Sequence, residues 1–215
     1  MKGLRYQSLC LERLASRFGA WHQSAQHLDD YAIDRMLGFR SDAIEARLRI
    51  GKLLLDLGDE LLFYDPAPYT FIRSLFRSLM PGKENVFYDL GSGYGRVLMY
   101  GGLISQATFR GIEVVPQRVA EANRVRDRLN LRNVDFVRGN ARDADFEDGD
   151  MFFFYNPFFT ETLREVGGRL KRIASQRSIR IASVGRSSDY FVGQVWLTES
   201  TLRPRLGLRF FASRT

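Results

Sequence analysis

The chain has 215 residues, of which 45% are hydrophobic and 27% charged, an ordinary globular composition with enough length for one sizeable core. The longest apolar run, Met151–Tyr155, falls far short of the roughly 18 residues that a membrane-spanning helix needs, so we expect no membrane partner. The net charge of +7 favours an acidic partner, but the arginines are spread through both halves, and a solvated basic surface explains the charge equally well.

Cysteine and histidine are scarce. Cys10 is the only cysteine, which excludes an internal disulfide and a cysteine-only metal site and fits a reducing, cytoplasmic setting. His22 and His27 have no acidic or cysteine partner at metal-ligand spacing, so we expect no metal. The acidic stretch 143–150 is interpreted as a solvated loop rather than a cation site.

Residues 4–62 repeat apolar side chains at helical spacing and contain few strand signals. The first 25 residues weakly resemble an organelle transit peptide, but Glu12 and the spacing of the leucines favour a folded amphipathic helix. Ser41 and Asp42 are typical of a helix start, and Gly58 of a helix end. Three helices are therefore predicted, over 4–18, 24–37 and 42–57. We expect residues 1–62 to form a helical extension in front of a second domain, 63–215.

From residue 64 onward the pattern changes. A turn-rich segment leads into a helix predicted over 70–79, and short apolar strands then alternate with helical stretches, as in a parallel sheet covered on both faces. Strands are predicted at 86–90, 109–113, 134–138, 151–156 and 179–184, and helices at 95–105, 116–130 and 160–174. Two last strands, 194–200 and 206–213, are expected to form an antiparallel hairpin. The predicted fold class is α/β, with a Rossmann-like, doubly wound, mostly parallel sheet.

A glycine-rich turn follows the first of these strands. Asp89 stands near the strand end, and Gly91, Gly93 and Gly95 precede the next helix. Glycines allow a sharp turn and let a ligand approach the backbone without a Cβ in the way. About 20 residues further on, the second strand ends in Glu113. A right-handed connection places this residue beside the turn, where its carboxylate can accept hydrogen bonds from both hydroxyls of a ribose. We therefore expect a ribose-containing cofactor against this turn.

A dinucleotide cofactor, and with it a nicotinamide-dependent oxidoreductase, is the competing interpretation. Its usual pattern is G-x-G-x-x-G, whereas here Gly95 comes one position early and the bulky Arg96 stands where the third glycine would pack. The carboxylate of Asp89 also suits a cationic amino-acid ligand better than a diphosphate, which it would repel.

These motifs, in this order, resemble the class I S-adenosylmethionine-dependent methyltransferases over residues 64–185. The turn that begins at Asp89 resembles their first motif, which implies that it receives the methionine part of the cofactor, and Glu113 stands in the second, as the ribose acid. Residues 137–141 resemble the third motif, which contacts adenine and in many members carries Asp where this chain has Asn140. An asparagine carbonyl can still accept from the adenine amine.

A fourth element, Asn156-Pro157-Phe158-Phe159, ends the strand over 151–156. It is similar to the N-P-P-[YF] loop of methyltransferases that act on planar exocyclic or amide nitrogens, with Phe158 in place of the second proline. The carbonyl oxygens of the Asn156 side chain and the Pro157 backbone can accept an amine's hydrogens and aim its lone pair, while Phe158 or Phe159 stacks on a planar substrate. Asn156, Pro157 and Phe158 are thus the candidate catalytic residues, although Asn-Pro is also a common turn signal.

The segment Tyr64-x-Pro66-x-Pro68-Tyr69 resembles the stretch before the first motif in some seven-strand lysine methyltransferases, where it lies over the cofactor. An aromatic face attracts a sulfonium, so Tyr64 or Tyr69 can pack on the cofactor, although a plain helix-entry turn explains the segment equally well. The resemblance as a whole implies S-adenosyl-L-methionine as the cofactor, with these candidate binding residues: Tyr64, Tyr69, Asp89, Gly91, Ser92, Gly93, Gly95, Glu113, Asn140, Ala141 and Asn156.

The predicted function is methyl transfer to a nitrogen, with a lysine-type amine of a protein as the first acceptor. A nucleobase in RNA or DNA and a small-molecule amine remain alternatives. In this interpretation the N-terminal helices form a lid or a substrate-recognition wall. Two readings from other classes stay open: a cofactor-binding module without catalysis, and the nicotinamide-dependent oxidoreductase.

Overall fold

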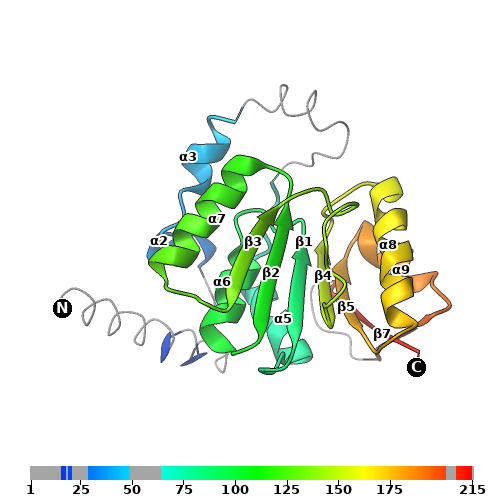
Figure 1. The fold of residues 1–215 in the computed structure, drawn as a ribbon. Coiled ribbons are helices and arrows are strands. Elements are labelled where there is room, and N and C mark those ends of the chain that lie inside the picture. Colours follow the sequence, from blue (N-terminus) through cyan, green and yellow to red (C-terminus); the bar gives the residue numbers. More distant parts are fainter. Residues whose placement is uncertain (1–15, 18, 21–28, 49–63, 202–206, 215) are drawn as a thin grey trace.

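A computed structural model describes residues 16–17, 19–20, 29–48, 64–201 and 207–214, and its centre is a seven-stranded sheet (Figure 1). The strands are β1 (Val86–Leu90), β2 (Thr108–Glu113), β3 (Val134–Arg138), β4 (Met151–Tyr155), β5 (Arg180–Val184), β6 (Leu197–Glu199) and β7 (Arg209–Ser213). Their order across the sheet is β3-β2-β1-β4-β5-β7-β6. Strands β1 to β5 pair in parallel, and β7 runs antiparallel to both β5 and β6. The predicted Rossmann-like sheet with an antiparallel closing pair is confirmed.

Helices cover both faces of this sheet (Figure 1). One face carries α5 (Tyr69–Leu79), α6 (Arg96–Ile104) and α7 (Pro116–Arg128), and the other carries α8 (Thr160–Ala174) and α9 (Arg186–Val192).

The apolar core is divided between the two faces because successive side chains of a strand point to opposite sides. On β4, Phe153 belongs to the cluster under α5 to α7, whereas Phe152 and Phe154 belong to the cluster under α8 and α9. On β1, Phe87 and Tyr88 divide in the same way. Both faces are thus closed by apolar packing, and polar side chains are left to the ends of the strands.

Two short helices of the N-terminal extension, α2 (Asp30–Leu37) and α3 (Ser41–Glu45), also belong to the described structure. The Asp29 side chain accepts from the backbone N–H of Ala32 at 3.1 Å and caps the start of α2. Gly38, with a φ of 85°, ends the helix in the left-handed conformation that favours glycine.

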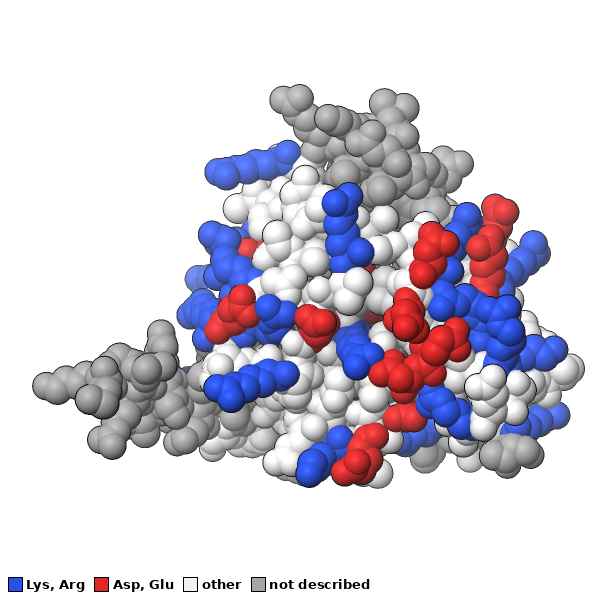
Figure 2. Space-filling model, viewed as in Figure 1, with Lys and Arg blue, Asp and Glu red and all other residues white. Residues whose placement is uncertain are grey.

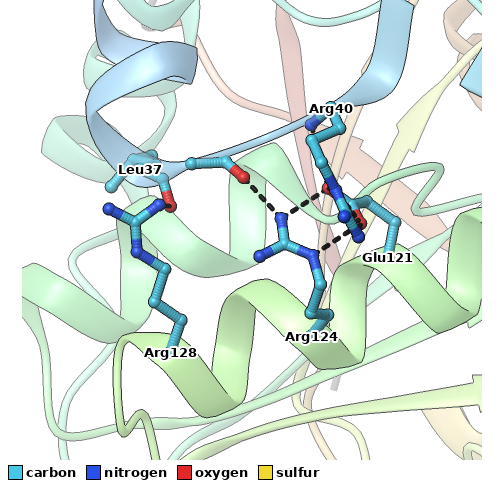
Figure 3. A network of polar contacts seen from close by, with 6 residues as sticks. Leu37, Arg40, Glu121, Arg124 and Arg128 are labelled. Carbon is cyan, nitrogen blue, oxygen red and sulfur yellow. Dashed lines mark hydrogen bonds and ion pairs between the residues drawn. The ribbon is translucent and has the colours of Figure 1, made fainter. Parts of the chain in front are cut away.

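A polar network fixes this extension to α7 (Figure 3). The buried carboxylate of Glu121 accepts from the backbone N–H of Arg40 at 2.9 Å and from its guanidinium at 2.8 Å. Arg124 donates to the same carboxylate and to the carbonyl oxygen of Gly38. Burial alone would raise the pKa of Glu121, but the hydrogen bonds from Arg124 and Arg40 outweigh it and lower that pKa to about 2.

Most predicted element boundaries agree with the structure to within two residues. The two closing strands begin later than expected, at residue 197 instead of 194 and at 209 instead of 206, and α9 was not predicted. The helix expected over 24–37 ends at Leu37 as predicted but begins only at Asp30, because Asp29 is extended and caps its start; residues 24–28 lie outside the described residues. The helix expected over 42–57 is wrong in extent, because α3 ends at Glu45 and residues 46–48 are not helical. Residues 49–57, and most of the helix expected over 4–18, lie outside the described residues.

Within the described ranges, no helix has the length and hydropathy needed to cross a membrane. The same residues contain no group of three or more His, Cys, Asp or Glu side chains arranged to hold a metal ion. The division of the chain at residue 62 stays a prediction.

Candidate active site

A cavity of about 330 Å³ lies at the carboxyl ends of β1, β2 and β4. The chain proceeds from β1 outward to β2 and β3 and then returns to β4 on the other side of β1, so the cavity lies at the point where the strand order reverses. Open α/β sheets bind their ligands at such a point. Most of the sequence-predicted residues line it: Tyr64, Asp89, Gly91, Ser92, Gly93, Glu113, Asn140, Ala141, Asn156, Pro157 and Phe158.

The glycine-rich turn ties β1 to β2 below this cavity. The backbone N–H groups of Gly91 and Ser92 both donate to the carbonyl oxygen of Ile112, at 2.8 and 3.0 Å. Gly93 has a φ of +55°, and a Cβ built on it would lie 3.0 Å from the ring of Tyr64. The turn itself therefore requires glycine at this position, in addition to any requirement of a ligand.

The carboxylate of Glu113 is buried at the end of β2 and is held by the backbone. One oxygen accepts from the N–H of Gly93 at 2.8 Å and the other from the N–H of Val115 at 2.9 Å. Burial raises the pKa of Glu113, while the Arg118 guanidinium 3.9 Å away and the backbone donors oppose that rise. Each carboxylate oxygen has lone pairs beyond those bonds, so Glu113 can still accept from the two hydroxyls of a ribose.

Asp89 lies beside Glu113 and is only 3% exposed. Burial first, and the negative charge of Glu113 second, raise the pKa of Asp89 to about 8. At neutral pH, with no cation beside it, Asp89 therefore favours its protonated form. A cationic group bound next to it would favour the carboxylate instead.

Asn140 and Ala141 line the side of the cavity that the sequence assigned to adenine. The side-chain oxygen of Asn140 accepts from the backbone N–H of Arg142 at 3.0 Å, which shapes this loop. The oxygen keeps a second lone pair and the amide keeps two hydrogens for a ligand.

Asn156 ends β4 in an unusual conformation. Its φ is 49°, a left-handed value that asparagine tolerates better than most residues. Its side chain packs against Gly185, where a Cβ would lie 2.6 Å from the amide oxygen. That amide oxygen is buried and has no hydrogen-bond partner among the described residues. Buried polar atoms are rarely left unpaired, and Asn156 is itself one of the residues that line the cavity.

The phenylalanines after Asn156 differ in their surroundings. Phe158 is 9% exposed and packs edge-on against Phe154 at 6.1 Å between ring centroids, so most of its ring belongs to the core. Phe159 is 38% exposed, and the Arg186 guanidinium lies 5.2 Å over its ring. Of the two rings, Phe159 is the more accessible to a planar substrate.

The two tyrosines of the segment before α5 point in different directions. Tyr64 lines the cavity and meets Tyr94 edge-on, with 4.8 Å between ring centroids. Tyr69 does not line it: its hydroxyl donates to Asp34 at 2.8 Å, and its backbone N–H donates to Asp30 at 2.9 Å. We therefore correct the predicted placement of Tyr69, which anchors α2. Gly95 is also not a lining residue, and it caps the start of α6 instead.

Three cavity arginines were not predicted as site residues. Arg96 pairs with Asp34, and Arg118 pairs with Glu45. No acidic partner of Arg186 is present in the part of the chain that the structure describes, although its guanidinium lies over Phe159. Arg186 begins α9 directly after β5, and its place at the carboxyl edge of the sheet was the signal that could have identified it.

Comparisons with known proteins agree on the fold. No protein-family model and no curated protein matches the sequence. Among solved structures, an RNA methyltransferase from Salinibacter ruber in complex with S-adenosyl-L-homocysteine is similar, with a TM-score of 0.52 and 19% identity over 69% of this chain and 92% of that chain.

Two further structures have the same TM-score of 0.52. A precorrin-6y C5,15-methyltransferase from Geobacter metallireducens is 16% identical over 69% of this chain and 89% of that one. TrmN from Thermus thermophilus is 12% identical over 68% of this chain and 48% of that one. At these identities the likeness shows the fold alone. The chain has the Rossmann-like fold of the class I methyltransferases.

Proposed function

We propose that this protein is an S-adenosylmethionine-dependent methyltransferase that transfers the methyl group to a nitrogen. One observation carries the proposal: Asp89, Glu113 and Asn156, whose amide oxygen has no hydrogen-bond partner among the described residues, line a single cavity at the switch point of the sheet. The first two suit the cofactor, and the third suits an acceptor. A dinucleotide is a poorer fit because Arg96 stands where the third glycine of its binding turn would pack.

The residues present fit the cofactor part by part. Glu113 would accept from the ribose hydroxyls, and Asp89 would pair with the ammonium of the methionine part. Asn140 and Ala141 would border the adenine. The ring of Tyr64 lines the cavity beside Gly93, and an aromatic ring next to the sulfonium would attract it. When bound, S-adenosyl-L-methionine supplies an electrophilic methyl carbon attached to a positively charged sulfur.

The chain's own contribution to methyl transfer is to orient the acceptor. The amide oxygen of Asn156 would accept an N–H of the acceptor and aim the nitrogen lone pair at the methyl carbon. The acceptor nitrogen would gain the methyl group that the bound cofactor supplies as its C–S bond breaks, and the nitrogen's surplus proton would pass to solvent. Such positioning can supply about 7 to 11 kcal/mol of the barrier in favourable cases, without a metal or a covalent nucleophile.

For the acceptor, we propose first a lysine-type amine of a protein. This rests on the segment before α5, in which Tyr64, Asp65 and Pro66 line the cavity as a wall next to the cofactor residues. The charged surface gives no support for a large anionic partner on the face seen in Figure 2, where Lys and Arg are interspersed with Asp and Glu. Basic side chains of the described residues also pair with acidic ones, as in Arg126–Asp135 and Arg110–Asp148.

A nucleobase is the second candidate, and one observation favours it. Arg186 lines the cavity and has no acidic partner among the described residues, and its guanidinium lies over the ring of the exposed Phe159. An aromatic ring beside a guanidinium suits a planar base with a neighbouring phosphate.

The test is methyl transfer from radiolabelled S-adenosylmethionine to separated protein, RNA and metabolite fractions of a cell extract. We expect label in the protein fraction with the wild-type protein and none with Glu113→Ala, which loses the ribose contact. Label confined to RNA would select the second candidate. Absence of label in every fraction, together with normal binding of S-adenosylhomocysteine, would favour a binding module without catalysis.

A further inference from the structure

Arg118 lies between the predicted ribose acid and the N-terminal extension. Its guanidinium is anchored on Glu45 of α3 by two contacts, Nε to Oε1 at 2.9 Å and Nη2 to Oε2 at 3.3 Å. Its third nitrogen, Nη1, is 3.9 Å from Oε1 of Glu113, which is beyond hydrogen-bond distance. The side chains of Arg118 and Glu113 are only 7% and 6% exposed, so this charge arrangement is shielded from water.

Further contacts hold this arrangement in one geometry. The hydroxyl of Tyr94, the residue after Gly93, donates to Glu45 at 2.9 Å. The ring of Tyr64 lies 5.5 Å from the Arg118 guanidinium and contacts Tyr94 edge-on. The glycine-rich turn, the cavity wall and α3 therefore meet around one arginine.

The distances indicate that Arg118 forms its hydrogen bonds with Glu45 and acts on Glu113 only through its charge. Burial raises the pKa of Glu113, and the nearby positive charge of Arg118 opposes that rise. An arginine free to move would form a bidentate pair with Glu113 and occupy the lone pairs that ribose hydroxyls need. Glu45 holds the guanidinium near enough to favour the charge on Glu113 and too far to take its hydrogen bonds.

We propose that Glu45 and Arg118 are positioning residues of the cofactor site, so that the N-terminal extension takes part in binding the ribose. The inference rests on the proposed function, because it assumes that the ribose binds at Glu113. It goes beyond that function in assigning a role to α3, a helix that comes from outside the sheet and its covering helices.

The experiment measures binding of 5′-methylthioadenosine against pH by calorimetry. This probe retains the adenine and ribose of the cofactor and lacks the amino acid, so it does not need the Asp89 carboxylate. The charged groups that face Glu113 are Asp89 from β1, Arg118 from α7 and, behind Arg118, Glu45 from α3. Binding should weaken as pH falls through the pKa of Glu113, because a protonated carboxyl accepts fewer hydrogen bonds.

Two variants, Arg118→Met and Glu45→Gln, should shift the acid limb, which is the pH range over which binding weakens, in opposite directions. Arg118→Met removes a positive charge, which raises the pKa of Glu113 and moves the limb to higher pH. Glu45→Gln removes a negative charge, which moves the limb to lower pH, yet it frees Arg118 to cover Glu113. Each variant should bind the probe about tenfold more weakly, the loss expected for one hydrogen bond to a charged group. In Arg118→Met the cause is protonation of Glu113 over a wider pH range, and in Glu45→Gln it is the Arg118 guanidinium covering the carboxylate. Arg118→Lys, which keeps the charge, should keep the limb near its wild-type position.

Glu121→Gln is the matched control, because it loosens the same extension from α7 through a residue that does not line the cavity. We expect the control to bind the probe as the wild type does. Equal weakening by Glu121→Gln and Glu45→Gln, or limbs that do not separate, would overturn the inference and leave the proposed function intact. A wild-type protein that binds neither this probe nor S-adenosylhomocysteine would overturn the proposed function and the inference together.

Discussion

Gly91 and Pro157 are in contact: a Cβ built on Gly91 would lie 2.3 Å from the Cβ of Pro157. This contact joins the turn after β1, which faces the cofactor, to the loop after β4, which faces the acceptor. The two halves of the site are therefore set against each other by backbone packing, and a side chain at Gly91 would separate them.

Gly91→Ala should destabilise the protein by about 1 to 3 kcal/mol, because overpacking adds to the strain of a non-glycine residue at a φ of +88°. Gly207→Ala is the control, since Gly207 has a φ of +75° and no described residue comes within 4 Å of the added Cβ. Urea denaturation should show the larger loss for Gly91→Ala. Equal losses would mean that the contact with Pro157 carries no cost.

Asp89 should release a proton when the cofactor binds. Its pKa of about 8 in the empty site leaves it mostly protonated at pH 7, and the ammonium of S-adenosylhomocysteine favours the carboxylate. Calorimetry at pH 7 in buffers of different ionisation enthalpy should show release of about one proton, falling towards zero above pH 9. Proton uptake at pH 7, or no buffer dependence, would contradict the pairing.

The same pKa has a consequence for stability. Because the folded state holds its proton up to about pH 8 and the unfolded state releases it near the ordinary value of 3.8, Asp89 makes the empty protein less stable as pH rises between those values. Asp89→Asn removes this contribution. The free energy of unfolding of this variant should therefore fall less between pH 5 and 8 than that of the wild type. Parallel curves of unfolding free energy against pH would show that Asp89 makes no such contribution.

Asn156→Ala should lower turnover far more than cofactor affinity. Loss of one orienting contact made mainly in the transition state costs about 2 to 4 kcal/mol, or roughly 30 to 1000-fold in rate. Asn130→Ala is the control for backbone strain, because Asn130 has a φ of 50°, close to the 49° of Asn156. Single-turnover methyl transfer within a few-fold of wild type in Asn156→Ala would reduce the residue to a strand-ending turn.

Asp34 should be the anchor through which α2 is fixed to the sheet domain. It accepts from Tyr69 and pairs with Arg96, whose side chain is 10% exposed. Asp34→Ala leaves these donors buried and should cost about 1 to 3 kcal/mol in urea denaturation. Glu199→Ala breaks a partly exposed pair with Arg209 and should cost about 1 kcal/mol or less. A smaller loss for Asp34→Ala than for Glu199→Ala would contradict the anchor.

The sheet and the site carboxylates could be predicted because their signals are local. Strands such as Val86–Leu90 are short and apolar in sequence. An acidic residue at the end of a parallel strand lies at the carboxyl edge of the sheet, so its position follows from the strand alone. The spacing of Tyr69 with Ile72 and Phe76 also indicates one buried helix face, which would have distinguished Tyr69 from Tyr64.

The remaining features depend on contacts between distant parts of the chain. Arg96 and Asp34 are 62 positions apart in the sequence, and Arg118 and Glu45 are 73 apart, so no local sequence motif indicates either ion pair. Helix α9 escaped prediction because its first turn contains two serines, which favour helices weakly. Burial of Phe191 and a 2.9 Å hydrogen bond between the Ser183 and Ser188 hydroxyls stabilise it in the folded protein.

The most direct test of the central claim is a calorimetric titration of the purified protein with S-adenosylhomocysteine and, separately, with NAD. A cavity that joins Asp89, Glu113 and the glycine-rich turn predicts saturable binding of S-adenosylhomocysteine, weakened by about 2 to 4 kcal/mol in Glu113→Ala, and no binding heat with NAD. Saturable binding of NAD with no heat from S-adenosylhomocysteine would contradict the methyltransferase assignment.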